Sequence, residues 1–170
     1  MSTAMTPDEA FTRFVKESTP TLTRTAWLLT GDREVAADLV QSAYVRTLQA
    51  WGKVADGAAT AYARRVIANE NIDRWRRRHR EVPVPDVQDR PAAGSFETRI
   101  ADADRVVRML AELNPQQRKV VVLRYYDDLA EDDVARLLGM SVQAVRSTAH
   151  RALTKLRRHY AAEALEGGRA

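Results

Sequence analysis

The side chains best suited to chemistry lie in one acid-free segment near the end of the chain. Between Ser141 and Tyr160 there is no Asp or Glu. The polar residues of this segment are the candidates for contact with DNA: Gln143, Arg146, Ser147, His150, Arg151, Thr154 and Lys155. An arginine can donate two parallel hydrogen bonds to guanine and a glutamine can pair with adenine, while hydroxyls and cations bind phosphates. These residue types therefore predict recognition of DNA.

Two predicted helices and a tight turn would position these side chains. Gly139 suits a turn with positive φ, and Ser141 can cap the helix that follows. Small Ala135 would let that second helix approach closely. Each helix has an apolar stripe: Leu129, Val134, Leu137 and Leu138 on the first, and Val142, Val145, Ala149, Leu153 and Leu156 on the second. This arrangement is typical of a helix-turn-helix with its recognition helix in the major groove. The alternative is a helical hairpin whose basic face is only solvated.

The composition argues against other classes of function. The 170 residues contain no cysteine, which excludes a disulfide scaffold, a thiolate zinc site and a cysteine nucleophile, and which fits a reducing cytoplasm. No secretory signal and no apolar stretch of about 20 residues is apparent, so we expect no membrane contact. His79, His150 and His159 lie among basic residues, without carboxylates at ligand spacing. The acidic pairs at 127–128 and 132–133 flank or begin a short helix, where the helix dipole favours them. We therefore expect no catalytic site, metal or cofactor.

The remaining sequence shows helical periodicity and no convincing strand pattern. Thr6 followed by Pro7 and Glu9 predicts a helix start, Gly31 a helix end, and Asp32 the cap of the next helix. Pro20 is expected to kink or restart the first of these helices. The second should bury a stripe that reaches Trp51, made of Val35, Leu39, Ala43 and Leu48 and widened by Val40 and Tyr44.

A second basic segment ends a helix predicted from about residue 61 to residue 80. Two apolar stripes on nearly opposite sides suit a helix with neighbours on both sides: Ala63, Val66 and Ile67 on one, and Ala68, Ile72 and Trp75 on the other. The stretch IDRWRRRHR then places five arginines around Trp75. The arginines predict a grip on an anionic backbone. Trp75 is interpreted as a packing residue, with base stacking as the alternative.

Composition also predicts the domain boundaries. Residues 82–103 contain three prolines and an excess of acidic over basic residues, which indicates a flexible linker. Asn114 followed by Pro115 and Gln117 predicts another helix cap. The sequence therefore predicts an all-α chain of two small helical bundles: 1–81, the linker 82–103, a helix-turn-helix domain at 104–160, and a frayed tail at 161–170.

Three stretches resemble bacterial RNA polymerase sigma factors. LNPQQRKVVVLRYYDDLAEDDVARLLGMSVQAVRSTAHRALTKLR resembles their minus-thirty-five reading domain. LTGDREVAADLVQSAYVRTLQAW resembles their polymerase-binding helix, and AYARRVIANENIDRWRRRHR resembles the helix that melts and reads the minus-ten element. Two domains in this order, joined by a short linker, are similar to the extracytoplasmic-function (ECF) group.

The resemblance implies a role for each set of residues. The polymerase clamp would contact Asp38, Gln41, Arg46 and Gln49. The minus-ten element would contact Lys53, Gly57, Asn69, Asp73, Arg74, Arg76 and Arg77, with the loop from Lys53 to Thr60 receiving a flipped base. Asn69 could instead be a buried structural amide. The implied partners are the clamp and flap regions of core RNA polymerase, promoter DNA and an anti-sigma factor, all in the cytoplasm.

Two positions depart from the family pattern. Ser42 stands where an acid is usual, and Ala130 stands where Ser or Thr usually opens the first helix of the turn motif. Either Asp128 caps that helix instead, or the helix starts weakly. Two alternatives to a sigma factor remain open: a helix-turn-helix regulator that works without polymerase, and an adaptor whose basic ends bind acidic proteins.

Overall fold

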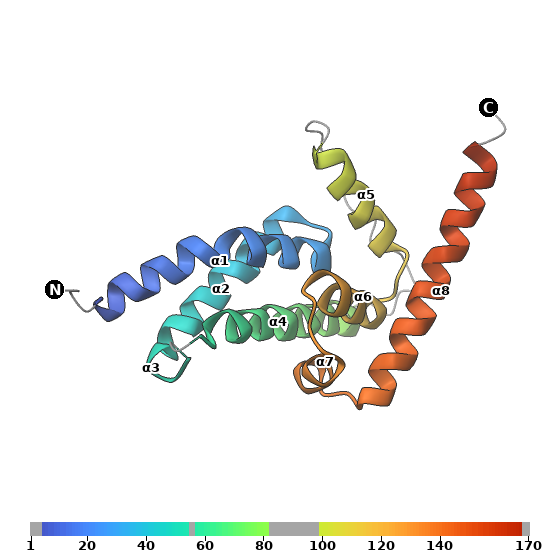
Figure 1. Cartoon of the computed structure of the whole chain (residues 1–170). Helices are drawn as coiled ribbons and strands as arrows, with labels where there is room; N and C mark the ends of the chain where they lie inside the picture. Colours follow the sequence, from blue (N-terminus) through green and yellow to red (C-terminus); the bar gives the residue numbers. More distant parts are fainter. Residues whose placement is uncertain (1–4, 55–56, 82–98, 168–170) are drawn as a thin grey trace. The chain divides into compact units, whose positions relative to one another are not determined.

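The described part of the chain is helical. The computed structural model describes residues 5–54, 57–81 and 99–167, and side chains are described at 5–54, 57–77 and 104–161. Helices connected by turns make up this part of the chain, which contains no strand (Figure 1). The chain divides into two compact units, Met1–Val82 and Pro83–Ala170. The prediction of an all-α fold with two helical bundles is confirmed.

The first unit is a bundle of three long helices and one short helix: α1 (Pro7–Thr30), α2 (Arg33–Gln49), α3 (Trp51–Val54) and α4 (Ala59–Glu81). α1 packs on α2 and α4, and α2 also packs on α4. Their contact is made by fully buried side chains such as Leu22, Ala43 and Ile67. The ring of Trp51 lies 5.0 Å from that of Phe11, which ties α3 to the start of α1.

The helix ends of this unit follow the predicted capping pattern. Thr6 and Glu9 form a capping box, in which each side chain bonds the other residue's backbone N–H. Gly31 ends α1 in the left-handed region with φ of 72°. The Asp32 side chain then accepts hydrogen bonds from the N–H groups of Glu34 and Val35. These three predictions are confirmed, because capping depends on neighbouring residues alone.

The predicted restart of the helix at Pro20 and the predicted burial of Leu48 are wrong. α1 continues through Pro20 instead of restarting there. A proline removes one backbone hydrogen bond, and the packing of α1 against two helices outweighs that loss. Leu48 is 52% exposed, and the buried position at this end of α2 belongs to Thr47. Thr47 can be buried because its hydroxyl donates to the carbonyl oxygen of Ala43 at 2.7 Å.

The second unit contains five successive helical segments: α5 (Arg99–Ala111), α6 (Pro115–Val121), η1 (Val122–Tyr126), α7 (Glu131–Leu138) and α8 (Val142–Gly167). α8 packs on α6 and α7. The predicted cap at Asn114 is confirmed as a capping box with Gln117. Two boundaries differ from the sequence analysis. Regular structure begins at Arg99 instead of near Asp104, and α8 extends through most of the segment predicted to be frayed. Residues 82–98 of the predicted linker lie outside the described residues.

The segment η1 is a π-helix, which widens the backbone just before α7. The N–H of Asp127 donates to the carbonyl oxygen of Val122, five residues earlier. Arg124 then donates to the carbonyl oxygen of Leu129 at 2.6 Å, which closes the turn. Asp128 has a positive φ of 53°, and Ala130 occupies the N-cap position of α7 without a side-chain cap. Asp128 therefore does not cap α7 in place of residue 130.

Candidate nucleic-acid interface

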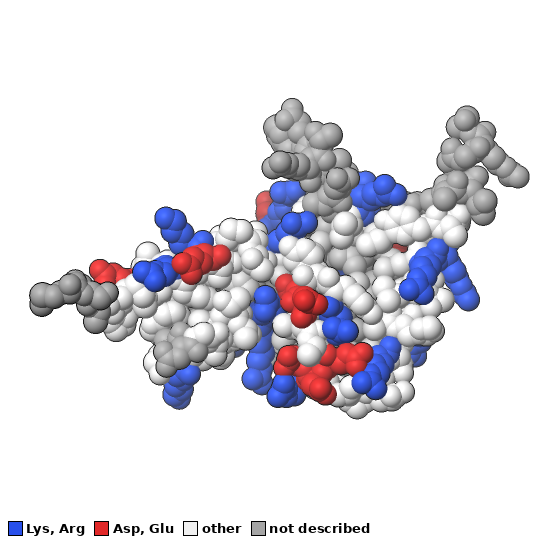
Figure 2. All heavy atoms as spheres, in the orientation of Figure 1, with Lys and Arg blue, Asp and Glu red and all other residues white. Residues whose placement is uncertain are grey.

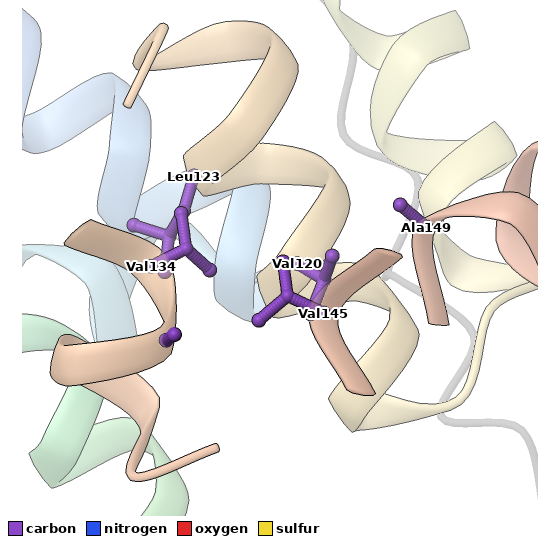
Figure 3. Packing of buried hydrophobic residues seen from close by; sticks show 6 residues of the cluster. Val120, Leu123, Val134, Val145 and Ala149 are labelled. Atoms are coloured by element: carbon purple, nitrogen blue, oxygen red, sulfur yellow. The ribbon is translucent and has the colours of Figure 1, made fainter. Parts of the chain in front are cut away.

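One apolar core joins the two helices of the turn motif (Figure 3). Its buried members come from α6, η1, α7 and α8: Val120, Leu123, Val134, Ala135, Val145 and Ala149. Partly buried apolar residues pack against this cluster: Leu129, Leu137, Leu138, Met140 and Val142. On α8, Thr148 and Ala152 are also buried, whereas Leu153 is half-buried. The stripe predicted for α8 is thus shifted slightly around the helix, and it still leaves the opposite side to polar residues.

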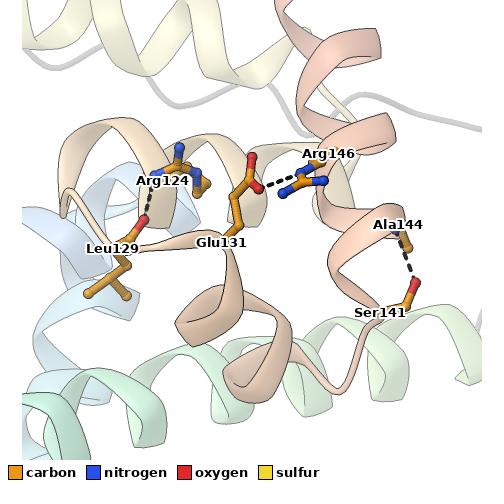
Figure 4. Close-up of polar contacts among 6 residues, drawn as sticks. All are labelled: Arg124, Leu129, Glu131, Ser141, Ala144 and Arg146. Carbon is orange, nitrogen blue, oxygen red and sulfur yellow. Dashed lines mark hydrogen bonds and ion pairs between the residues drawn. The ribbon is translucent and has the colours of Figure 1, made fainter.

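The turn between α7 and α8 has the geometry expected of a helix-turn-helix. Gly139 adopts the left-handed conformation with φ of 64°. The hydroxyl of Ser141 accepts a hydrogen bond from the N–H of Ala144 at 3.1 Å, which caps α8 (Figure 4). A residue with a side chain would be strained at Gly139 even though nothing lies within 4 Å of an added Cβ. The turn residues therefore fix how α8 leaves α7.

The polar side of α8 is open to solvent along its length. Gln143, Arg146, His150, Arg151 and Lys155 are exposed, and Ser147 and Thr154 are half-buried. The central four of these residues line one hollow on the surface: Arg146, Ser147, His150 and Arg151. Acidic side chains gather over α7 and basic side chains over α8 (Figure 2). This face can approach a polyanion without burying a carboxylate of its own helix.

Sequence reasoning missed one contact of this face. The Nε atom of Arg146 lies 2.5 Å from the Oε2 atom of Glu131, at the start of α7 (Figure 4). The ion pair joins residues fifteen positions apart, which only the folded turn motif brings together. No local signal in the sequence predicts this ion pair, because it depends on how α7 and α8 pack against each other.

In the first unit, the predicted polymerase-binding residues share the exposed side of α2. Asp38, Gln41, Arg46 and Gln49 are all exposed. Two apolar side chains lie among them, Val45 at 57% and Leu48 at 52% exposure. Val45 and Leu48 were not assigned to the polymerase-binding surface from the sequence, and Leu48 was placed in the buried stripe. Exposed apolar groups surrounded by polar ones are typical of protein–protein contact sites.

A carboxylate from α4 organises the edge of this surface. Glu70 accepts a hydrogen bond from Ser42 and pairs with Nε of Arg46, both at 2.8 Å. The Glu70 side chain is 19% exposed, so these two contacts are partly screened from water. α4 thus supplies a carboxylate beside Ser42, the position where the family usually has an acid.

The candidate minus-ten residues occupy α3, the following turn and the second half of α4. Lys53 and Gly57 are exposed, and Gly57 has a positive φ of 81°. Residues 55–56 of the predicted base-receiving loop lie outside the described residues. Asn69 is exposed, so the alternative of a buried structural amide is wrong. Asp73, Arg76 and Arg77 are exposed as well, and Arg74 is half-buried.

Trp75 lies between these arginines and is 37% exposed. Most of Trp75 is therefore covered, in line with a packing role, while part of the residue remains available to solvent. The side chains of residues 78–80 lie outside the described residues. Within the described residues, no cluster of three or more metal-binding side chains occurs, and no helix has the length and apolarity needed to cross a membrane.

Comparison with known proteins identifies both units. The family model for Sigma-70 region 2 matches residues 14–81, and that for Sigma-70, region 4 matches residues 103–156. The chain is 40% identical to the RNA polymerase sigma-E factor of Streptomyces avermitilis over 149 residues, which cover 86% of this chain and 83% of that protein. It is 37% identical to the RNA polymerase sigma-E factor of Streptomyces coelicolor over 158 residues, covering 92% and 89% of the two chains.

The fold is also found among solved structures. The sigma factor RpoE of Bartonella quintana, crystallised with the anti-sigma factor NepR, superposes with a TM-score of 0.68 at 24% identity, covering 87% of this chain and 94% of that one. Because the sequence relatives exceed 30% identity over most of their length, they establish the family as well as the fold. The chain therefore belongs to the sigma-70 family, in its ECF group, and is a sigma factor that directs promoter-specific transcription initiation.

Proposed function

We propose that this sigma factor divides its work between three surfaces: the exposed side of α2 binds core RNA polymerase, the α3–α4 region opens and reads the minus-ten element, and α8 reads the minus-thirty-five element. The observation that carries the proposal is the polar side of α8, which is exposed from Gln143 to Lys155 and has no acidic residue. The other two assignments depend on exposed residues in the unit that matches region 2.

The contact with polymerase is assigned to the α2 surface. Asp38, Gln41, Arg46 and Gln49 supply polar groups around the apolar pair Val45 and Leu48. Covering the apolar part of such a surface contributes favourably to the free energy of binding, and the charged residues around it determine the orientation of the partner. A helix-turn-helix regulator that works without polymerase has no use for this exposed pair, which argues against that alternative.

Minus-ten recognition is assigned to the turn that contains Gly57 and to the exposed face of α4. Asn69, Asp73 and Arg76 recur at a spacing of three to four residues, so they lie along one side of the helix. Arg74, Arg76 and Arg77 would hold the phosphates. The turn, with Lys53 before it, would receive an extruded base, at an unstacking cost of a few kcal/mol.

Minus-thirty-five recognition is assigned to α8. Gln143 and Arg146 supply the donors and acceptors that suit base edges. Ser147, His150, Arg151, Thr154 and Lys155 continue the same face, where hydroxyls and cations suit phosphates. Two modest DNA contacts held on one polymerase reinforce each other through effective concentration. The site of action is the cytoplasm, where RNA polymerase works, and the family is not a family of enzymes.

An anti-sigma protein is the proposed regulatory partner. The Bartonella quintana sigma factor with the same fold was crystallised with one. For this chain, the exposed α2 surface is the simplest target, because a protein bound there would compete directly with polymerase.

Run-off transcription tests the proposal. Full-length protein is mixed with core RNA polymerase and promoter templates, and initiation is measured beside core binding. The Arg146→Ala variant is expected to bind core normally and to lose selectivity between promoters. A wild-type protein that neither binds core nor supports initiation would refute the proposal. An Arg146→Ala variant that fails to bind core would refute the division of labour between the surfaces.

A further inference from the structure

Arg146, the proposed base-reading residue, is held by a carboxylate from the other helix of the turn motif. Its Nε atom lies 2.5 Å from Oε2 of Glu131, which begins α7. The Arg146 side chain is 61% exposed, and that of Glu131 is 30% exposed. The carboxylate is thus partly enclosed, while the arginine side chain extends toward solvent. The pair therefore differs from an ion pair between two fully exposed side chains, in which both partners move freely.

Only one side of the guanidinium is used. Nε takes part in the contact, whereas neither terminal nitrogen of Arg146 has a hydrogen-bond or ion-pair partner among the described residues. The two terminal nitrogens form the end of the planar fork that can donate bidentately to O6 and N7 of guanine. Figure 4 shows the Glu131 carboxylate and the guanidinium facing each other in the space between α7 and α8. A contact through Nε therefore restricts the orientation of the guanidinium and leaves its two terminal nitrogens available.

The Glu131 carboxylate pairs with Arg146 and with no other described side chain. Among the described residues, Arg146 is its sole ion-pair or side-chain hydrogen-bond partner. Its neighbours in the first turn of α7 behave differently: Asp133 pairs with Arg136, and Asp132 makes no such contact within the same set of residues. The N-terminal end of the helix dipole favours the negative charge at this position. The Glu131 carboxylate therefore lies where it can accept a hydrogen bond from Arg146.

We propose that Glu131 is a positioning residue for base reading: it orients Arg146 so that the end of the guanidinium meets a guanine of the promoter. The inference rests on the proposed role of α8. An arginine side chain loses rotamer freedom when it binds, and an arginine already fixed by Glu131 loses less on meeting its base. The same carboxylate repels phosphates, so it disfavours contacts in which Arg146 binds the DNA backbone at incorrect sites.

Base preference, measured in the complete system, tests this role. Holoenzyme is reconstituted from the full-length chain and core RNA polymerase, and is incubated with a duplex library that is randomised over the upstream element. Sequencing of the bound DNA gives the preference at each position. The wild-type protein is expected to prefer guanine at one position, and Arg146→Ala to lose that preference.

The variants at position 131 carry the expected result. Glu131→Ala lowers the preference for that guanine by about twofold to tenfold, the range that follows from releasing one long side chain. Glu131→Gln keeps a neutral acceptor and gives an intermediate loss. Asp132→Ala is the matched control, because it removes the same charge from the same helix turn without touching Arg146, and it should leave the preference unchanged.

Three results would overturn the inference. If Arg146→Ala keeps the wild-type preferences, Arg146 reads no base, and the proposed function of α8 fails together with the role of Glu131. If Arg146→Ala loses the guanine preference and Glu131→Ala keeps or increases it, Glu131 does not position the arginine, while the proposed function stands. If Asp132→Ala causes the same loss as Glu131→Ala, the effect is one of general charge.

Discussion

Replacement of Leu48 by alanine tests the assignment of the α2 surface. Complete burial of a leucine side chain contributes about 1.5–3 kcal/mol. Leu48 is 52% exposed in the free protein, so roughly half of that range, about 0.8–1.5 kcal/mol, is still available when a partner covers it. At 1.4 kcal/mol for each factor of ten, the Leu48→Ala variant should bind core polymerase about fourfold to twelvefold more weakly.

The assay is a titration of fluorescently labelled full-length protein with core RNA polymerase. Because Leu48 is exposed, the change should leave the stability of the unit within about 0.5 kcal/mol of the wild type, as thermal unfolding will show. Met5→Ala is the control: Met5 is also apolar and 42% exposed, and it precedes α1 instead of lying on α2. If Leu48→Ala binds core as tightly as the wild type, or if Met5→Ala weakens binding equally, the α2 surface is not the contact site.

Three further predictions concern stability. Leu123→Ala removes a fully buried side chain from the core of the turn motif and should cost about 2–5 kcal/mol, so hydrogen exchange should accelerate in α6–α8 and stay unchanged in α1–α4. Ala130→Ser should raise the unfolding free energy by about 0.5–2 kcal/mol in urea titrations, because position 130 has the backbone of a cap and lacks a capping side chain. Hydrogen bonds from the backbone and then the side chain of Thr6 lower the pKa of Glu9. The stabilisation from Glu9 is therefore present above its unfolded pKa and is lost as pH falls through the lower folded value, which NMR titration of α1 should show. Thr6→Ala should reduce the shift in the pKa of Glu9 without abolishing it, because alanine lacks the hydroxyl and keeps the backbone N–H that donates to Glu9.

The local features of the fold could be predicted from the sequence. The caps at Thr6, Asp32 and Asn114 and the turn at Gly139 each depend on residues within a few positions of one another. The apolar sides of α7 and α8 could be predicted for the same reason, since helical periodicity alone shows which side of each helix is apolar, whereas Val120 and Leu123 of the same core were not predicted. The exposed polar side of α8 followed directly from that stripe.

Other features could not be predicted because they depend on neighbours that are remote in sequence. Pro20 remains helical because α1 packs against two other helices, and the residues around Pro20 give no indication of this packing. Leu48 was assigned to the buried stripe by its type, while the arrangement of α2 against α1 and α4 turns Thr47 inward instead. The exposure of Asn69 depends in the same way on which side of α4 its neighbours cover.

By itself, the sequence determined the class of the protein, the two helical units and the helix that carries an acid-free polar face. Helix caps, turn residues and apolar periodicity are properties of short segments, so they can be recognised without knowledge of the rest of the chain. Only the tertiary structure decided how the working side chains are held. Glu131 meets Arg146, and Glu70 meets Ser42 and Arg46, across helix pairs. Such ion pairs require two helices to be placed within a few ångströms, and that placement is a result of packing the whole unit.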